Sequence, residues 1–419
     1  MIRSILLAAA STVVATALAA PASASSLFLD NATFIEDSGA TRTVDMRIVD
    51  GRIAAMGTSL RAPDGVETVT GAWISTGLVA PYSTLGIVDI GGEASTNDTQ
   101  AETDLFSAAV LAADSFNPRE VHIANARRRG VTHAAIVTRP DGDRIFGGIG
   151  AVAKLDNSND SLVSERAFMH VALGQAGASR AGGSRGAAIQ QLRSAIDDAR
   201  RSYLQHVEGD VFQRRDARAF RQVVSGDMPL MISASRASDL LRIIRIKQDV
   251  PALDIIVIGA EEAHLVADDL AEAGIRVVVD PLENLPDNFD SVNASFDNVV
   301  VLEEAGVEYA IGGLSSLGVV KAGGLAQHAG NAVAQGLPYA AAIQAITTTP
   351  ASWFGVDLGE RRVGADATMV VWDGDPLEVT SAPIALYMDG DEVTLSSRMT
   401  ALRDRYNPAL EDDRPYKYR

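Results

Sequence analysis

The stretch STGLVAPYSTLGIV, residues 75–88, decides the fold prediction. After a turn with Gly77, a short apolar run from Leu78 ends at a polar Pro-Tyr-Ser-Thr tip, which is typical of a buried strand. Similar apolar runs alternate with helix-like stretches along the chain, as expected of βα units around a parallel sheet. Eight such units close a (β/α)8 barrel. The predicted strands are 78–83, 131–137, 149–155, 167–173, 229–233, 254–258, 275–279 and 307–311.

Both ends of the chain are β-like. Residues 27–56 alternate short β-type runs with Ser-Gly and Asp-Gly turns, which predicts antiparallel strands. Residues 367–372 and 384–388 have the same character. We therefore expect a small composite β-sandwich from residues 25–74 and 355–400, the barrel inserted as residues 75–354, and a C-terminal tail at 401–419.

The composition excludes several classes of function. The chain has 419 residues, a globular 47% hydrophobic content and no cysteine, so disulfides and thiolate chemistry are excluded. Its formal charge is −18, which disfavours nucleic acid and anionic membranes as partners. Residues 1–24 combine one arginine, an apolar run and a small-residue Ala-Ser-Ala end, which is typical of a signal peptide. The sequence predicts cleavage after Ala24, a mature charge of −19, and a secreted or periplasmic protein that is not held in a membrane.

Three longer segments resemble a known family. They are VDGRIAAMG at 49–57, STGLVAP at 75–81, and AITTTPASWFGV with GADATMVVWDGDPLE at 345–356 and 364–378. Together they are similar to the amidohydrolase superfamily, in its imidazolonepropionase-like, metal-dependent branch. The resemblance implies a barrel inserted in a composite β-sandwich. It also implies a hydrolase of carbon–nitrogen bonds other than ordinary peptide bonds, with Zn²⁺ or another divalent metal. Thr368 departs from this pattern, because the family usually has Asp there.

The resemblance also marks where the metal ligands are missing. The two histidines that end the family's first barrel strand correspond here to Tyr82 and Thr84. Phenol and hydroxyl groups are poor ligands at neutral pH compared with a neutral imidazole. The remaining family ligand positions are also substituted, by Gln175, Ser233, Ser235, Ile258 and Leu314. The sequence therefore predicts no bound metal cofactor, and an activity that is weakened or lost.

Other residues are candidates for a ligand-binding role. Arg236 and Asp239 are kept as in the family, and His170 lies on a predicted strand whose alternate residues point into the barrel. For His170, simple packing is the alternative. Arg180 and Arg185 lie on a glycine-rich segment, 174–186, which we expect to be a mobile loop. With Arg236 they form a candidate cationic mouth for a carboxylate-bearing ligand, the alternative being ordinary solvated arginines.

Two functional hypotheses remain open at this stage. The first is an enzyme, either with relocated metal ligands from Glu93, Asp98, Asp280 and Glu283 or with a metal-free mechanism. A serine mechanism lacks a G-x-S-x-G elbow, and the sequence identifies no histidine or aspartate partner for the candidate serines Ser233, Ser235, Ser315 and Ser316. The second hypothesis is a non-catalytic homologue that binds a small molecule or a partner, as a homo-oligomer or as a hetero-oligomer with an active paralogue.

Overall fold

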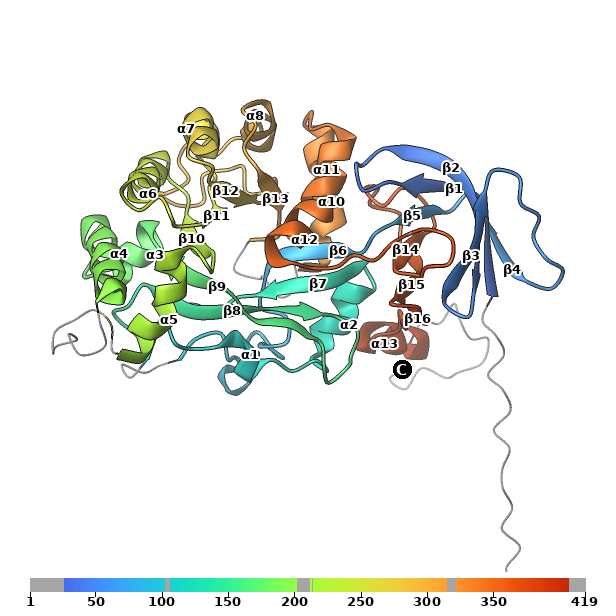
Figure 1. The fold of residues 1–419 in the computed structure, drawn as a ribbon, viewed down its shortest axis with the longest axis horizontal. Helices are drawn as coiled ribbons and strands as arrows, with labels where there is room; N and C mark the ends of the chain where they lie inside the picture. The colour runs from blue at the N-terminus through green and yellow to red at the C-terminus, as the bar shows by residue number, and fades with distance from the viewer. Residues whose placement is uncertain (1–25, 102–105, 202–211, 213, 315–321, 407–419) are drawn as a thin grey trace, which may run out of the picture.

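The computed structural model describes residues 26–101, 106–201, 212, 214–314 and 322–406. The predicted signal peptide, Ser315, Ser316 and the end of the tail lie outside these residues. The described chain contains two eight-stranded sheets (Figure 1), a large one surrounded by helices and a smaller curled one beside it. No helix in the described part is long and apolar enough to cross a lipid bilayer.

The large sheet contains all eight strands that the sequence predicts, in chain order. Most of the boundaries differ from the prediction by a few residues. The strands are β6 (Leu78–Ser83), β7 (Val131–Ile136), β8 (Phe146–Lys154), β9 (Leu162–Ala172), β10 (Leu230–Ala234), β11 (Ile255–Gly259), β12 (Arg276–Val279) and β13 (Tyr309–Ile311).

The prediction of a regular (β/α)8 repeat is wrong at the third strand. β8 pairs antiparallel with both β7 and β9, whereas β6–β7 and the pairs from β9 to β13 are parallel. The reason is the length of the connections, since only residues 137–145 and 155–161 link β8 to its neighbours. A parallel pair needs a crossover of a dozen or more residues, so these short links produce hairpins instead.

The barrel-like sheet is nearly closed. In the described residues, β6 and β13 form no ladder with each other. Helix α12 (Thr348–Phe354) packs against both of these strands, and the Val79 amide donates to the Ile346 carbonyl at 2.9 Å. Trp353 and Phe354 of α12 belong to the apolar interior of the barrel, and Trp353 donates its ring N–H to Glu308 at the start of β13. This helix therefore blocks the N-terminal end of the barrel and leaves the C-terminal end for a site.

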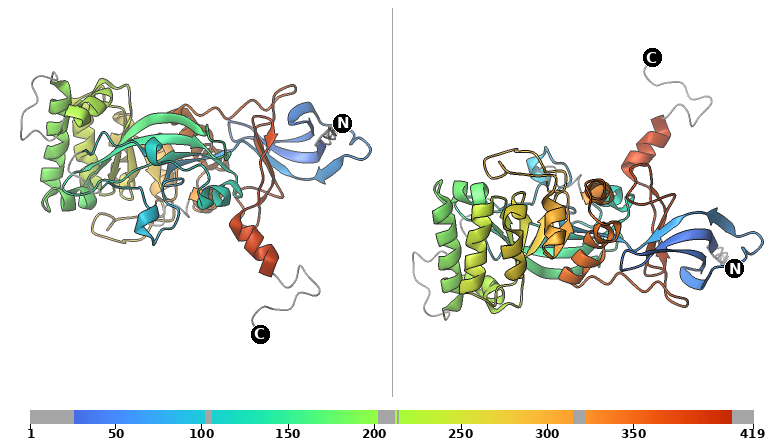
Figure 2. Two further views of the ribbon diagram at one scale, coloured as in Figure 1. Left: turned by 90° about the horizontal axis from the view of Figure 1, so that it is seen from below. Right: turned by 90° about the horizontal axis from the view of Figure 1, so that it is seen from above.

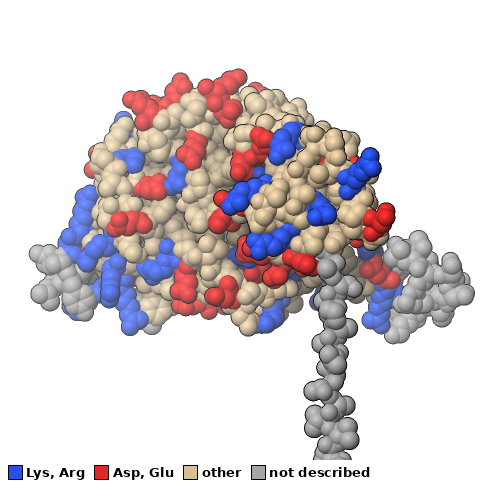
Figure 3. Space-filling view, turned by 45° about the vertical axis from the view of Figure 1, so that its right-hand side comes forward, with Lys and Arg blue, Asp and Glu red and all other residues tan. Residues whose placement is uncertain are grey.

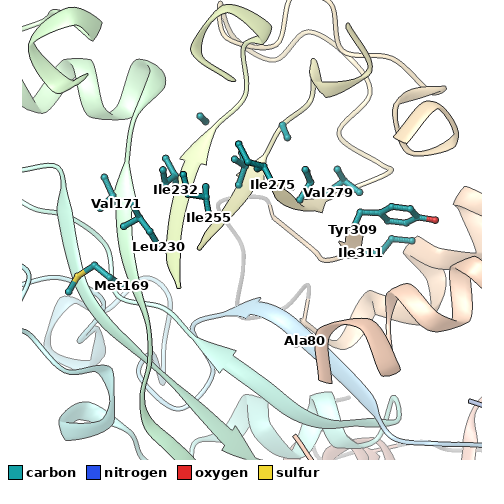
Figure 4. Packing of buried hydrophobic residues seen from close by; sticks show 14 of the residues in the cluster. Ala80, Met169, Val171, Leu230, Ile232, Ile255, Ile275, Val279, Tyr309 and Ile311 are labelled. Atoms are coloured by element: carbon teal, nitrogen blue, oxygen red, sulfur yellow. The ribbon is translucent and has the colours of Figure 1, made fainter. Parts of the chain in front are cut away.

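Strand alternation sorts the barrel residues into two sets. Side chains such as Val171, Ile232 and Val279 face outward and pack beneath the helices (Figure 4), whereas Met231, Ile256 and Val278 belong to the interior cluster. Because alternate residues of a strand face the same side, the next inward positions at the C-terminal ends of β10 and β11 are Ser233 and Ile258. These positions are the floor of the barrel mouth.

The barrel helices follow the strands and cover the outside of the sheet (Figure 1). They bury apolar stripes such as Leu192, Ile196 and Ala199. The helices are α1 (Ala112–Ser115), α2 (Val121–Arg127), α3 (Gly174–Arg180), α4 (Arg185–Arg200), α5 (Arg214–Ser225), α6 (Ala237–Asp249), α7 (Ala267–Glu272), α8 (Asn298–Glu304), α10 (Leu325–Ala334), α11 (Tyr339–Ala345) and the 3₁₀ helices η1 (Ala94–Thr96), η3 (Ala263–Val266) and η4 (Ala322–Gly324).

The second sheet joins the two ends of the chain, as the sequence predicts, but its strands form one sheet, so the predicted β-sandwich is not confirmed. β14 from the C-terminal part pairs antiparallel with β5 from the N-terminal part, and the Trp372 indole donates to the Ser75 hydroxyl at 2.9 Å. The strands form one curled sheet in the order β16-β15-β14-β5-β1-β2-β3, with β4 beside β1. They are β1 (Ser26–Ile35), β2 (Thr41–Val49), β3 (Arg52–Gly57), β4 (Glu67–Thr70), β5 (Trp73–Ser75), β14 (Met369–Trp372), β15 (Pro383–Met388) and β16 (Asp391–Glu392).

Beyond this sheet, helix α13 (Arg398–Tyr406) projects from the body of the molecule (Figure 2) and buries none of its residues. Acidic and basic side chains are interspersed on the face shown in Figure 3.

Candidate functional site

A cavity of about 420 Å³ opens at the C-terminal ends of the barrel strands. This volume lies within the range of small-molecule sites in proteins. Six of the seven predicted pocket residues line it, namely Tyr82, Gln175, Ser233, Ser235, Ile258 and Leu314. The seventh, Thr84, is buried and is not part of the cavity wall. The candidate binding residues His170, Arg236 and Asp239 are also absent from the wall. His170 contacts Ser233 in the wall, and Arg236 and Asp239 belong to a network of ion pairs at the rim.

The central contact of the site joins β9 to β10. His170 Nε2 lies 2.9 Å from the Ser233 hydroxyl, and His170 Nδ1 lies 2.7 Å from the Thr138 carbonyl oxygen. A carbonyl only accepts hydrogen bonds, so Nδ1 carries the proton and Nε2 accepts from Ser233. The pKa of His170 is lowered to about 4, mainly by burial; the hydrogen bond to the Thr138 carbonyl opposes this shift and the charge of the nearby Arg139 guanidinium adds to it. The imidazole is therefore neutral near pH 7.

Tyr82 forms the β6 side of the same site. Its ring meets the His170 ring edge-on, with a centroid separation of 6.3 Å. Burial raises the pKa of the Tyr82 phenol, while the Arg139 guanidinium, through its charge and a hydrogen bond to that hydroxyl, opposes the rise. Because Arg139 has only donors, the phenol oxygen accepts from it and keeps its own O–H available to the cavity.

Glu261 supplies a carboxyl group to the opposite wall. Burial raises its pKa, a hydrogen bond from Ser235 opposes this, and the charges of Glu283 and Asp280 add to the rise. Its Oε2 atom is buried without a hydrogen-bond partner. Gly259 has a φ of +98°, and a side chain there would come within 3.1 Å of the Ser235 hydroxyl and 3.3 Å of Glu261 Oε2. This glycine therefore leaves room for the serine–glutamate contact.

A network of ion pairs holds the rim of the cavity. Arg185 contacts Asp290 and lies 3.5 Å from Asp239, which in turn binds Arg236 at 3.0 Å. Asp290 also accepts from the Gln175 amide, so the network links α3, α4 and α6 to the loop after β12. Both aspartates are buried. Their charges are compensated by the arginines, as expected of buried carboxylates.

The helices around this network correct one prediction. The glycine-rich segment 174–186 is not a loop throughout, because α3 occupies Gly174–Arg180 and α4 begins at Arg185. The cationic mouth of Arg180, Arg185 and Arg236 stays a prediction, and the structure shows that each of these arginines has protein partners. Arg185 and Arg236 are paired with aspartates, and Arg180 binds the Gly142 carbonyl and faces Asp141.

The predicted relocated metal ligands serve other purposes. Asp280 accepts from His328 Nδ1 at 2.7 Å and from the amides of Leu314 and Leu282. Burial alone would raise its pKa, but the His328 bond and charge with these amides hold it below the usual value. Glu93 is exposed and caps η1 through Ser95, and Asp98 is exposed. Across the described ranges, no three His, Asp or Glu side chains are grouped so that they would hold a metal ion.

The donor set at the barrel mouth does not fit the family's metal. A divalent transition metal in a hydrolase needs imidazole or carboxylate donors. The family ligand positions offer a neutral phenol, hydroxyls, an amide and two apolar side chains instead. Ser233 is already bonded to His170, and Asp290 is already bonded to Arg185. No reaction step at this site is therefore assigned to a metal.

Comparison with known proteins identifies the fold. An amidohydrolase from Thermotoga maritima MSB8 has a TM-score of 0.74 and 25% sequence identity, over 88% of this chain and 99% of that one. The structural neighbours of this chain are therefore amidohydrolase-family proteins, and the chain is similar to them in fold. A prolidase complexed with N-methylphosphonate-L-proline has a TM-score of 0.50 and 16% identity over the same shares, which shows the common fold alone.

Sequence comparison adds a local match to this amidohydrolase relationship. The amidohydrolase tasK of Hapsidospora irregularis is 47% identical over 68 residues, or 15% of this chain. The matched segment spans 7% of that much longer protein. No protein-family model matches the chain.

The sequence analysis missed the partner of Ser233 and the part played by Arg139. His170 and Ser233 are 63 positions apart and belong to no shared motif. The available signal was the inward position of both residues at the ends of neighbouring predicted strands. For Arg139, the signal was its place just after the second predicted strand, at the face of a barrel where sites form.

Proposed function

We propose that this amidohydrolase-superfamily protein binds small molecules with an amide-like carbon–nitrogen bond and hydrolyses them without the family's metal. The observation that carries the proposal is the composition of the cavity wall. The wall contains Tyr82, Ser233, Ile258 and Leu314 at the positions of the family's metal ligands, and the residues that the structure describes form no cage of imidazoles and carboxylates. The metal-dependent activity is accordingly proposed to be lost.

The cavity wall supports a substrate that has both polar and apolar groups. Ser233, Ser235, Tyr82 and Glu261 provide hydroxyl and carboxyl groups for hydrogen bonds to an amide, while Ile258 and Leu314 provide apolar contacts. Cyclic amides, ureas and N-acyl amino acids have this character. They are the substrate classes we propose.

A second candidate function is ligand binding without turnover. It is favoured by Ile258 and Leu314, since these apolar side chains replace groups that activate water in a metal-dependent site. In this case the cavity would serve recognition, in a homo-oligomer or beside an active paralogue.

The experiment combines metal analysis with activity measurements. We expect the purified protein to contain less metal than a stoichiometric site requires, and to hydrolyse members of a panel of cyclic amides, ureas and N-acyl amino acids. The rate should be unchanged by a chelator or by added Zn²⁺. The double variant Ile258→His with Leu314→Asp is the control, which should not gain a stoichiometric metal because Tyr82 and Thr84 remain.

The outcomes separate the candidates. Binding of panel compounds without hydrolysis would favour the recognition role. Stoichiometric metal in the purified protein, or a rate that depends on added metal, would contradict the proposal.

We also propose that the protein is exported, which rests on the sequence of residues 1–24. Cell fractionation followed by N-terminal sequencing should find a mature chain that begins after Ala24, outside the cytoplasm. A full-length chain in the cytoplasmic fraction would contradict this. The oligomeric state can be measured on the same material by light scattering.

A further inference from the structure

We propose that Ser233 is a nucleophile and His170 its general base, so that this cavity carries out a metal-independent acyl transfer. The inference rests on the proposed function and names the residues that would perform it. It concerns acyl compounds, that is amides and related acyl derivatives whose carbonyl carbon can accept a hydroxyl oxygen.

The first support is the geometry of the pair. Ser233 lies partly exposed in the cavity wall, and His170 is buried behind it with Nε2 at 2.9 Å from the hydroxyl. This is the distance at which a general base accepts a proton from a serine. The lone pair is on Nε2, because Nδ1 donates its proton to the Thr138 carbonyl at 2.7 Å.

The second support is the way in which the histidine is held. In a catalytic triad a third group orients the imidazole by accepting from Nδ1–H. The Thr138 carbonyl occupies this role here, and Gly147 on β8 makes the approach possible. A Cβ atom at Gly147 would lie 2.6 Å from the Thr138 oxygen and 2.8 Å from His170 Nδ1. Thr138 after β7 and Gly147 on β8 thus hold the His170 imidazole in one orientation.

The third support is a donor for the developing negative charge. Tyr82 lines the same cavity as Ser233, and its ring meets the His170 ring edge-on with a centroid separation of 6.3 Å. Arg139 donates to the phenol oxygen, which leaves the Tyr82 O–H free to donate and polarises it. A neutral O–H donor supported by a cation is suited to stabilise an oxyanion.

The reaction is balanced by groups in the site and by water. As Ser233 Oγ bonds to the acyl carbon, its proton passes to His170 Nε2 and the carbonyl electron pair moves to the oxygen, towards Tyr82. When the carbonyl re-forms, the carbon–nitrogen bond breaks and the leaving amine takes the proton from His170. Water then attacks the carbonyl carbon of the serine ester and loses a proton to Nε2; as the bond from that carbon to Ser233 Oγ breaks, Nε2 returns the proton to Oγ, which releases the acid and regenerates Ser233 and neutral His170. The net change is hydrolysis of an amide to an acid and an amine.

The site also predicts the speed of this reaction. The backbone carbonyl carries no formal charge to stabilise the imidazolium, and Arg139 disfavours it. His170 is therefore a weaker base than a histidine whose pKa lies near the working pH, so we expect slow turnover.

The test uses a fluorophosphonate, which phosphonylates an activated serine as its P–F bond breaks and the serine proton goes to the base. The purified full chain should be labelled at Ser233, as read by peptide mass spectrometry. Ser233→Ala should abolish labelling, and Ser225→Ala, on α5 outside the cavity, should not change it. His170→Gln should lower the labelling rate by about 100-fold or more, the lower end of the usual contribution of a general base.

Two controls keep the result interpretable. Circular dichroism and thermal unfolding of each variant show that the loss of labelling is not a loss of fold. Compound binding by Ser233→Ala, measured by thermal shift, should persist because the cavity remains.

The outcomes also separate this inference from the proposed function. Absent labelling of the wild type, or labelling of Ser235 in place of Ser233, would overturn the inference. Unchanged amide hydrolysis by Ser233→Ala would do the same and leave the proposed metal-free function intact. A protein that neither binds nor hydrolyses any panel compound would contradict the proposed function itself.

Discussion

At the scale of single residues, the site depends on side chains that are buried in an uncharged form. His170 and His133 are both buried, and the pKa of His133 is likewise lowered to about 4, mainly by burial, with the charge of Lys154 adding to the shift and that of Asp389 opposing it. In the unfolded chain a histidine titrates near its ordinary pKa of about 6.5. As the pH falls from about 6.5 towards 4, the unfolded chain takes up these protons first and the folded state loses stability.

This pH effect gives a prediction for His170→Gln. Glutamine keeps a donor and an acceptor but remains neutral, so the variant should lose less stability than the wild type between pH 6.5 and 4. The difference between the pKa of His170 in the unfolded chain and in the folded chain corresponds to roughly 3 kcal/mol of the free energy of unfolding, lost once His170 is fully protonated. Urea unfolding of both proteins at several pH values measures it. If the free energy of unfolding depended on pH equally in the two proteins, His170 would not be buried in its neutral form.

At the scale of elements, β8 is the strand that distinguishes this barrel from a regular repeat, and its glycines let neighbouring groups approach closely. A Cβ atom at Gly150 would lie 2.1 Å from the Phe168 ring, and one at Gly147 would displace the His170–Thr138 bond. The glycines of the FGGIG run at the start of β8 are therefore required for packing around the site. The run does not match a phosphate-binding glycine motif.

Gly147→Ala tests this reading of β8. The new methyl group should displace the imidazole, lower the fluorophosphonate labelling rate by at least about 10-fold, and cost about 1–3 kcal/mol through overpacking. Compound binding should change little, because Gly147 does not line the cavity. Gly186→Ala is the matched control, since a Cβ atom there meets only an ordinary contact with Ser184. Full labelling of Gly147→Ala would show that the strand tolerates the methyl group and that His170 needs no such space.

At the scale of the whole molecule, the two ends of the chain complete one sheet beside the barrel. β14 pairs with β5, and Trp372 packs against Gly130 at the foot of β7, where φ is +82°. Arg127 on α2 adds a further link, since it donates to the carbonyls of Leu155 and Thr394. The C-terminal strands are thus part of the core rather than an appendage.

A chain that ends at Val363 should therefore fail to fold independently. It would lack β14–β16 and remove buried residues such as Met369, Trp372 and Leu386 from the core. Loss of a single large core side chain costs about 3–5 kcal/mol, against a typical domain stability of 5–15 kcal/mol. We expect insoluble protein or a non-cooperative thermal transition. The control is a chain that ends at Ser397, before α13, which should unfold as the wild type does.

Elements that depend on a local pattern of residues could be predicted from the amino-acid sequence. Apolar runs and turn residues predicted every barrel strand, the antiparallel N-terminal strands and the pairing of the two ends. These patterns could be recognised because a buried or alternating strand is encoded by residues that are close together in the sequence. The family pattern marked Tyr82, Ser233 and Leu314 as substituted ligand positions. The antiparallel direction of β8, the arginine–aspartate rim and the bond between His170 and Ser233 became visible only in the folded chain. These features depend on which distant residues meet across neighbouring strands, and that is set by packing of the whole barrel rather than by any one segment.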